Sequence, residues 1–170
     1  MIKKILSAML CAVTLTLCAG YEFPVDGKFR KLKDGMPEKW QISDASSAKI
    51  VRGESFFSRA LELSAGKSAV QAVSKQTFPV MANDFVKVEA EVKGQGNAFL
   101  AVEVLDAAGK SVAVKKIAVR PATDRFTDLK GKLRVADYAK YTPTTVRIII
   151  GAEAGAKVAF YDVEAESDDD

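Results

Sequence analysis

The segment FVKVEAEVKG, residues 85–94, alternates apolar and charged side chains. In an extended chain successive side chains point to opposite faces, so every second residue lies on the same side. One face of this segment carries Val86, Val88, Ala90 and Val92. An apolar face opposite a charged one is typical of a strand that covers a core on one side and meets water on the other. The segment therefore predicts a β-sheet with one buried face.

The segments around residues 85–94 repeat this strand pattern. NAFLAVEVLD, the turn DAAGK and SVAVKKIAV predict a hairpin over Leu100–Val119. Further strands are expected in RALELS (59–64), DRFTDLKGKLRV (124–135), TTVRIIIGAE (144–153) and AKVAFYDVEAES (156–167). The residues expected to face inward from these segments are Leu61, Leu63, Leu100, Val102, Val104, Phe126, Leu129, Leu133 and Val135.

About nine or ten such strands at this spacing predict an all-β protein, an antiparallel two-sheet β-sandwich. We expect a single sandwich domain over residues 21–166 and an acidic C-terminal tail over residues 167–170. Residues 136–143, ADYAKYTP, form either a short helical turn or a loop. The basic KFRKLK, residues 28–33, would complement the acidic end of the chain if the first and last strands are neighbours.

Residues 1–20 have the anatomy of a secretory signal peptide. Lys3 and Lys4 precede an apolar stretch of 13 residues, which is too short for a comfortable membrane span, and small residues follow. We therefore expect a secreted protein, extracellular or periplasmic, without a membrane span. A lipid anchor on Cys18 is the weaker alternative, because Leu17 stands where a lipobox has a small residue.

Composition excludes several kinds of chemistry. The chain has no histidine, and both of its cysteines, Cys11 and Cys18, lie in the leader. Histidine-dependent nucleophile systems and the usual zinc, copper and haem ligands are therefore absent from the mature chain. Without the leader, 23 basic residues face 22 acidic ones, and this near-neutral balance argues against nucleic acid as a partner. Carboxylates, Lys, Arg and Tyr remain for catalysis, and oxygen ligands remain for calcium.

The order of these segments is similar to that of a known group of domains. VDGKF and DGMPEKW, then SSAKIVRGESFFSRALELS, VEVLDAAGKSV and TTVRIIIGAEAGAKVAFYDVEAE, follow one another over Phe23–Glu166. This succession resembles the carbohydrate-binding-module jelly rolls of families 4, 9 and 22. The resemblance implies a galactose-binding-like β-sandwich that binds sugar rather than cleaving it.

Two departures from that family concern its metal and its aromatic residues. Arg30 stands where the family has a glutamate that helps to hold a structural calcium, and Phe126 replaces a strand tryptophan. The only carboxylates that we expect at such a calcium site are those of Asp26 and Asp162, near the joined ends of the chain. Calcium takes six to eight oxygens, so backbone carbonyls would have to complete the site. No other cofactor is expected.

Sugar binding requires exposed aromatic faces and polar groups at their rim. Trp40 is either such a platform or a core plug, and the resemblance favours the plug, because in those modules this tryptophan mostly packs on the core. Phe56 and Phe57 face opposite ways in an extended segment, so one can join the core while the other stays exposed beside Arg59. Tyr138 and Tyr141 either bracket a sugar or cap the sandwich. The candidate ligand-binding residues are Trp40, Phe57, Arg59, Tyr138 and Tyr141.

The sequence leaves three functions open. The first is a secreted, non-catalytic carbohydrate-binding protein whose partner is a polysaccharide or glycan. The second is a structural or protein-interaction module of a secreted or cell-surface assembly, without a small ligand. The third is a polysaccharide lyase or glycosidase. In a lyase, Tyr138 or Tyr141 would act as the base, and Arg120 or Arg125 would neutralise a uronate. An exposed aromatic face, an apolar patch or a pocket with two perturbed titratable groups would distinguish them.

Overall fold

The computed structural model describes residues 21–138 and 144–168. It contains fourteen strands and two short 3-10 helices, η1 (Ala45–Ser47) and η2 (Val135–Asp137). The strands are β1 (Tyr21–Glu22), β2 (Leu32–Lys33), β3 (Met36–Pro37), β4 (Trp40–Ile42), β5 (Ala48–Arg52), β6 (Arg59–Ser64), β7 (Val70–Ser74), β8 (Phe78–Val80), β9 (Phe85–Gln95), β10 (Asn97–Leu105), β11 (Ser111–Pro121), β12 (Thr127–Arg134), β13 (Thr144–Ala152) and β14 (Lys157–Asp168).

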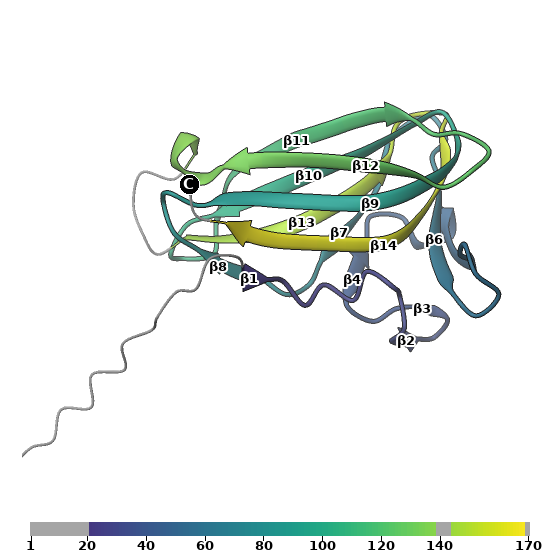
Figure 1. Cartoon of the computed structure of the whole chain (residues 1–170), viewed down its shortest axis with the longest axis horizontal. Helices are drawn as coiled ribbons and strands as arrows, with labels where there is room; N and C mark the ends of the chain where they lie inside the picture. Colours follow the sequence, from purple (N-terminus) through teal and green to yellow (C-terminus); the bar gives the residue numbers. More distant parts are fainter. Residues whose placement is uncertain (1–20, 139–143, 169–170) are drawn as a thin grey trace, which may run out of the picture.

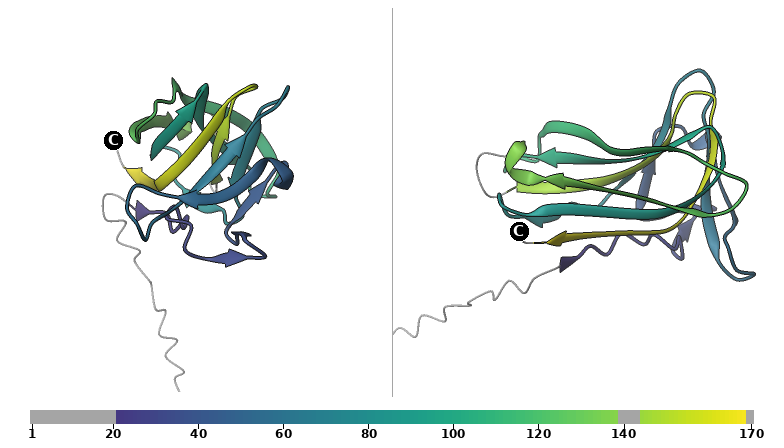
Figure 2. Two further views of the ribbon diagram at one scale, coloured as in Figure 1. Left: turned by 90° about the vertical axis from the view of Figure 1, so that its right-hand side faces the viewer. Right: turned by 45° about the horizontal axis from the view of Figure 1, so that its top comes forward.

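Twelve of these strands form two antiparallel sheets packed face to face, and β2 and β3 pair with each other in a separate two-stranded sheet (Figure 1). The first sheet has the order β12-β9-β14-β6-β5, with β1 paired to β14. The second sheet has the order β11-β10-β13-β7-β4, with β8 paired to β13. Figure 2 shows β1 and the segment after it running alongside β14, so the first and last strands are neighbours. The expected all-β sandwich is confirmed, and so is the hairpin, which β10 and β11 form.

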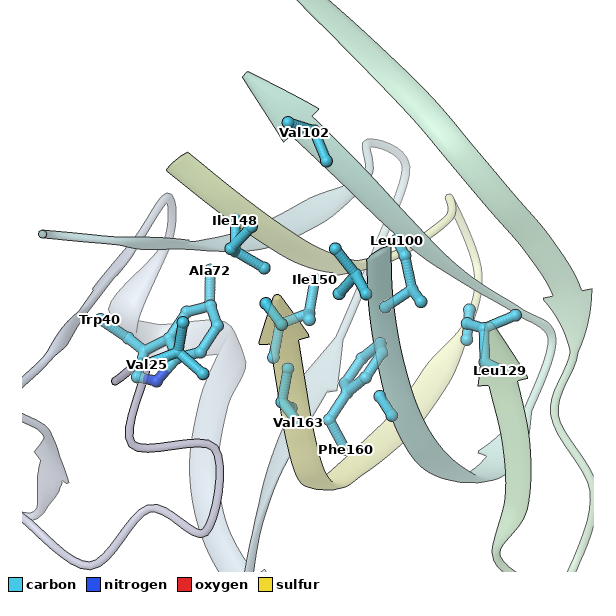
Figure 3. Close-up of a cluster of buried hydrophobic side chains, with 14 of the residues drawn as sticks. Val25, Trp40, Ala72, Leu100, Val102, Leu129, Ile148, Ile150, Phe160 and Val163 are labelled. Carbon is cyan, nitrogen blue, oxygen red and sulfur yellow. The ribbon is translucent and has the colours of Figure 1, made fainter. Parts of the chain in front are cut away.

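The core lies between the two sheets and is built from alternate residues of their strands (Figure 3). The four inward residues expected in 85–94 are 0–3% exposed in β9, and Leu100, Val102 and Val104 are completely buried in β10. Phe160 of β14 meets this layer from the middle of the first sheet. Burial of apolar surface of this kind is the main force holding the fold, since the described part of the chain contains no cysteine.

Trp40 belongs to this core and is only 2% exposed. Its ring packs against Phe29, with a centroid separation of 6.0 Å, and its indole N–H points to the backbone oxygen of Asp26 at 3.5 Å. A ring buried in this way cannot offer a face to a ligand. Trp40 is therefore the core plug, and its inclusion among the ligand-binding candidates was wrong.

Phe126 was expected to face inward, and this expectation was also wrong. β12 begins at Thr127, and its inward positions are 127, 129, 131 and 133, so residue 126 has the parity of the outer face. At position 131 the inward side chain is absent, because a Cβ on Gly131 would lie 2.6 Å from the backbone oxygen of Ile117. β11 thus approaches β12 closely at this glycine.

The two ends of the chain depart from the expected boundaries in different ways. β14 continues through Ser167 to Asp168, two residues that we assigned to the tail, and Lys87 forms an ion pair with Asp168. The expected signal peptide, residues 1–20, lies outside the described residues, as do residues 139–143 and 169–170. Within the described ranges, no helix has the length and apolarity of a membrane span.

Candidate functional site

The outer face of the first sheet, the side away from the core, holds the surface features that could bind a ligand. Five hollows in the described surface are all lined by residues of this sheet or of the segments joined to it. Because β9 turns its valines inward, Lys87, Glu89, Glu91 and Lys93 lie on this outer face. The neighbouring strand β14 would repeat that polar pattern, but an irregularity interrupts it.

The irregularity is a bulge in β14 between Tyr161 and Glu164. Asp162 has a φ of 48°, a left-handed conformation that few non-glycine residues adopt. The buried positions shift there from Val158 and Phe160 to Val163 and Ala165, so Tyr161 and Asp162 both become partly exposed. Such a bulge re-aims a side chain within a regular strand. Tyr161 faces outward because it follows the inward Phe160, and the bulge leaves Asp162 partly exposed as well before Val163 returns to the core.

Tyr161 meets Phe126 on this outer face. The ring centroids lie 5.8 Å apart with an interplanar angle of 60°, a favourable tilted contact. The ammonium of Lys93 lies 5.8 Å from the Phe126 centroid. Both rings are partly exposed, so this ring pair, Tyr161 and Phe126, presents aromatic surface to solvent.

A hollow of about 470 Å³ opens beside Tyr161, and we call it the cationic hollow. Its lining comes from the segment after β1, the loop between β5 and β6, the first residue of β6, and β14. The lining residues are Lys28, Arg30, Ser55, Phe57, Ser58, Arg59 and Tyr161. β6 stands at the end of the molecule away from β1 and β8 (Figure 1). The hollow therefore lies toward one end of the first sheet.

The loop between β5 and β6, residues 53–58, is held by its own hydrogen bonds. The amide of Gly53 donates to the carbonyl of Ser58 at 2.9 Å, and the amide of Ser55 donates to Oγ of Ser58 at 2.8 Å. Phe56 and Phe57 contact edge to face and are 70% and 92% exposed. Phe57 is thus exposed beside Arg59 as expected, but Phe56 is exposed too, because the turn carries both rings beyond the sheet edge.

A second hollow, of about 390 Å³, contains Phe126 in its lining. Arg52, Lys93, Gln95 and Lys157 supply long polar side chains to it, and Glu62 supplies a carboxylate. Glu62 is already paired with Lys49 at 3.1 Å and Lys157 at 3.5 Å. The ring pair consequently has a hollow on each side, one containing Tyr161 and one containing Phe126.

Carboxylates gather on the β9 side of the ring pair. Glu91 pairs in register with Tyr161 on one side and Asp128 on the other. Partial burial raises the pKa of Glu91, and the negative charges of Glu54, Asp162 and Asp128 raise it further. The hollow at these carboxylates is only about 90 Å³. Asp162 belongs to this acidic row and also forms an ion pair with Lys28 of the cationic hollow, so the two linings meet there.

The expected calcium site does not fit the residues that the structure brings together. Both carboxylate oxygens of Asp26 accept backbone amides, from Arg30 at 3.1 Å and Lys31 at 3.0 Å. Asp162 instead takes the ammonium of Lys28 at 3.2 Å, a partner that raises the pKa of Lys28. No group of three or more carboxylates suited to a metal occurs among the described residues. Lys28 supplies the positive charge at Asp162, so we derive no role for calcium.

The remaining candidate residues are separated from the cationic hollow. Tyr138 follows η2 and packs against the core, in agreement with the capping interpretation. η2 begins after Arg134, which lies six residues along β12 from Asp128, or about 20 Å at the rise of a strand. Tyr141 lies outside the described residues. Of the five expected ligand-binding residues, the structure brings together Phe57 and Arg59.

Sequence reasoning missed Tyr161, Phe126 and the two basic residues Lys28 and Arg30 as parts of one surface. The signal for Phe126 was its parity with the outward charges of KGKLR. The signal for Tyr161 was weaker, since a bulge is needed to interpret the run AFYDVEAE. No local pattern joins Arg30 to Arg59, which are 29 residues apart and meet only in the folded chain.

No protein-family model matches this chain, and no curated protein matches its sequence. Solved structures do share its architecture. An arabinose-bound α-L-arabinofuranosidase has a TM-score of 0.61 and 15% identity, covering 88% of this chain and 26% of its own. The CBM22-1 xylan-binding domain from Paenibacillus barcinonensis has a TM-score of 0.56 and 14% identity, covering 85% of this chain and 93% of its own.

The chain has the fold of the carbohydrate-binding-module jelly rolls. The same architecture also occurs in a cyclase from Fischerella sp. in complex with 4-(1H-indol-3-yl)butan-2-one, with a TM-score of 0.66 and 9% identity, covering 88% of this chain and 98% of that one. This chain spans about a quarter of the arabinofuranosidase. At these identities the likeness establishes the fold alone, and the function must be argued from the site.

Proposed function

We propose that this protein is an exported, non-catalytic carbohydrate-binding protein whose glycan lies across the ring pair of Tyr161 and Phe126. The observation that carries the proposal is the ring pair itself, two partly exposed rings on a sheet face with a hollow on each side. Aromatic faces take up the C–H surfaces of sugar rings, and polar groups at the rim fix their orientation. Export rests on the leader-like residues 1–20.

The rim of the ring pair has the polar groups that sugar hydroxyls require. Arg52, Lys93 and Gln95 line the hollow beside Phe126, and Arg30 and Arg59 line the hollow beside Tyr161. These side chains donate hydrogen bonds in planar or fan-shaped arrangements that match vicinal hydroxyls. The two hollows, of about 390 and 470 Å³, lie within the size range of about 300–1,000 Å³ that small ligands occupy.

Binding without cleavage is favoured by the arrangement of the carboxylates. A glycosidase needs two carboxyl groups on either side of the scissile bond, one of them with a raised pKa. Glu91 has a raised pKa, but the hollow that it shares with Asp128 and Asp162 measures about 90 Å³, too small for a sugar ring. The positions of the lyase candidates also argue against catalysis, because Tyr138 packs on the core and Arg120 donates to the backbone oxygen of Asp128.

One observation favours the protein-interaction module as a second candidate. Val112, Val114 and Val119 on β11 are about half exposed, and among the described strands β11 pairs within its sheet with β10 alone. An edge strand with apolar side chains can accept a strand or an apolar surface from a partner. This candidate becomes the preferred one if the protein binds no glycan.

Affinity electrophoresis through gels that contain a panel of plant, algal and bacterial polysaccharides tests the proposal. The wild-type protein should be retarded by at least one of them, and Tyr161→Ala and Phe126→Ala should each weaken that retardation about tenfold, as loss of one buried ring face predicts. Tyr21→Ala is the matched control, because Tyr21 is also an exposed ring of the first sheet, in β1. Retardation by no polysaccharide, or equal losses in all three variants, would overturn the proposal.

A further inference from the structure

The cationic hollow differs in charge from the other hollows of the first sheet. The linings of the other four each include at least one Asp or Glu. The cationic hollow is lined by Lys28, Arg30 and Arg59 with no carboxylate. A neutral glycan needs no such excess of positive charge, so the lining favours a negatively charged ligand.

The two arginines of this hollow keep their charge available. Among the described residues, neither Arg30 nor Arg59 has a carboxylate within ion-pair distance, whereas Lys28 shares its charge with Asp162. Nη1 of Arg59 donates to the backbone oxygen of Arg30 at 3.1 Å, a contact that ties the two segments together. The other guanidinium N–H groups can meet a planar oxyanion in a two-point contact.

The segment that carries Lys28 and Arg30 is fixed in place before any ligand arrives. The carboxylate of Asp26 accepts the amides of Arg30 and Lys31, and the amide of Phe29 donates to the carbonyl of Asp26 at 3.0 Å. Phe29 is itself completely buried. Asp26 thus organises a basic turn rather than a metal, and a preorganised site loses less entropy on binding.

The same segment is held close to the sheet at Gly27. This residue forms a bridge with Val163 of β14, and a Cβ at position 27 would lie 1.8 Å from the Val163 carbonyl oxygen. Only glycine permits this approach. The contact sets the basic turn beside Tyr161 and the bulge that follows it, so cations and an aromatic ring line one hollow.

From this combination we propose that the cationic hollow binds an acidic saccharide, a uronate residue whose carboxylate meets Arg30 and Arg59 while its ring lies against Tyr161. The volume of about 470 Å³ admits a short saccharide. Phe57, 92% exposed at the rim, covers the sugar from the loop side. This inference rests on the proposed glycan-binding function and names the class of glycan for the same surface.

The test compares uronate polymers with neutral counterparts of the same backbone. The full-length protein is run through gels containing polygalacturonate, alginate or glucuronoxylan, and through gels with the carboxyl-reduced form of each polymer. At least one uronate polymer should retard the protein about tenfold more strongly than its reduced form. Because charge pairs are screened, the difference should shrink in 0.5 M salt.

Variants separate a built site from general charge attraction. The double variant Arg30→Gln, Arg59→Gln should lose about tenfold or more in retardation by the uronate polymer. The control Arg134→Gln removes a charge from an exposed residue of β12 on the same sheet, outside the five hollows, and should change retardation less than twofold. Equal losses in the double variant and the control would overturn the inference.

The remaining outcomes distinguish this inference from the proposed function. If reduced polymers bind as well as uronate polymers and Tyr161→Ala weakens both, the glycan-binding function stands and the acidic-sugar inference is wrong. If dextran sulfate binds through Arg30 and Arg59 but no uronate polymer does, the ligand is a sulfate ester and the uronate assignment is wrong. If no polymer binds, the proposed function fails and takes this inference with it.

Discussion

The two sheets differ in how much aromatic surface their outer faces expose. On the first sheet, Tyr161 and Phe126 are partly exposed between two hollows. On the second sheet, Phe99 also lies on the face away from the core, yet it is only 2% exposed. It forms a small apolar cluster with Ala101 and Ile149, apart from the main core.

Phe99 is covered by the charged side chains of its own sheet. The ammonium of Lys116 lies 4.6 Å from the ring centroid and is held there by Glu153 at 2.5 Å. Beneath the ring, the missing side chain of Gly151 leaves the space that Phe99 occupies, which we call its seat. A Cβ at position 151 would lie 2.1 Å from Cζ of Phe99. The second sheet thus covers its outward ring almost completely, whereas the first sheet leaves Tyr161 and Phe126 partly exposed. This difference is the reason to place the binding surface on the first sheet.

The largest expected effect contrasts two adjacent residues of β14. Phe160→Ala removes a completely buried ring from the core and should lower the free energy of unfolding by about 3–5 kcal/mol. Tyr161→Ala removes an outward ring and should lower it by less than about 1 kcal/mol, although it weakens glycan retardation about tenfold. Urea unfolding followed by far-UV circular dichroism measures both.

The milder Phe160→Leu keeps this comparison usable if the alanine variant does not fold, and it should cost less than about 1.5 kcal/mol while leaving retardation unchanged. Similar stability losses in Phe160→Ala and Tyr161→Ala would mean that the ring of Tyr161 is not the outward one of this adjacent pair.

A smaller effect is expected from filling the seat of Phe99. Gly151→Ala places a methyl group against the ring, and overpacking of this kind costs about 1–3 kcal/mol. Gly66→Ala is the matched control, because a Cβ at Gly66 meets nothing within 4 Å. Urea unfolding of both variants should show the loss in Gly151→Ala alone. Equal stability of the two variants would contradict the proposed seat, and with it the contrast between covered and uncovered rings.

The fold could be predicted because its signal is local. In residues 85–94 every second side chain is a small apolar one, and one register places all of them inside. β10 shows where this reasoning stops. Its residues 98–105 are buried on both faces, so alternation reveals the core residues but not the second cluster around Phe99. A continuous apolar run, AFLAV, was the available sign of burial on both faces.

The site could be predicted only in part, because its residues come from distant segments. Phe57 and Arg59 were found, since a loop flanked by strand patterns is expected to be exposed. Tyr161 directly precedes a bulge that breaks the alternation of β14, so the sequence alone does not show which residues of this run face outward. Arg30 reaches Arg59 only through the bridge of Gly27 to β14 and the pairing of β14 with β6. These contacts are tertiary, so spacing along the chain does not reveal them.

The smallest expected effect tests the carboxylates of the two outer faces. Glu103 on the second sheet accepts a hydrogen bond from Arg147 at 2.7 Å, whereas Glu91 on the first sheet faces the negative charges of Glu54, Asp162 and Asp128. A raised pKa in the folded state means that Glu91 lowers stability as pH rises from about 4.5 through its folded value, because the unfolded chain releases that proton more readily.

Glu91→Gln should therefore stabilise the protein at pH 7, by up to about 0.5 kcal/mol, and this gain should vanish near pH 4, where Glu91 is protonated in the folded state. Glu103→Gln is the matched control and should act in the opposite direction at pH 7, since Arg147 loses its charged partner. Thermal unfolding from pH 4 to pH 8 measures both variants. A pH-independent gain in Glu91→Gln would show that packing, not charge repulsion, sets its effect. The carboxylates on the two outer faces would then not differ in electrostatic energy.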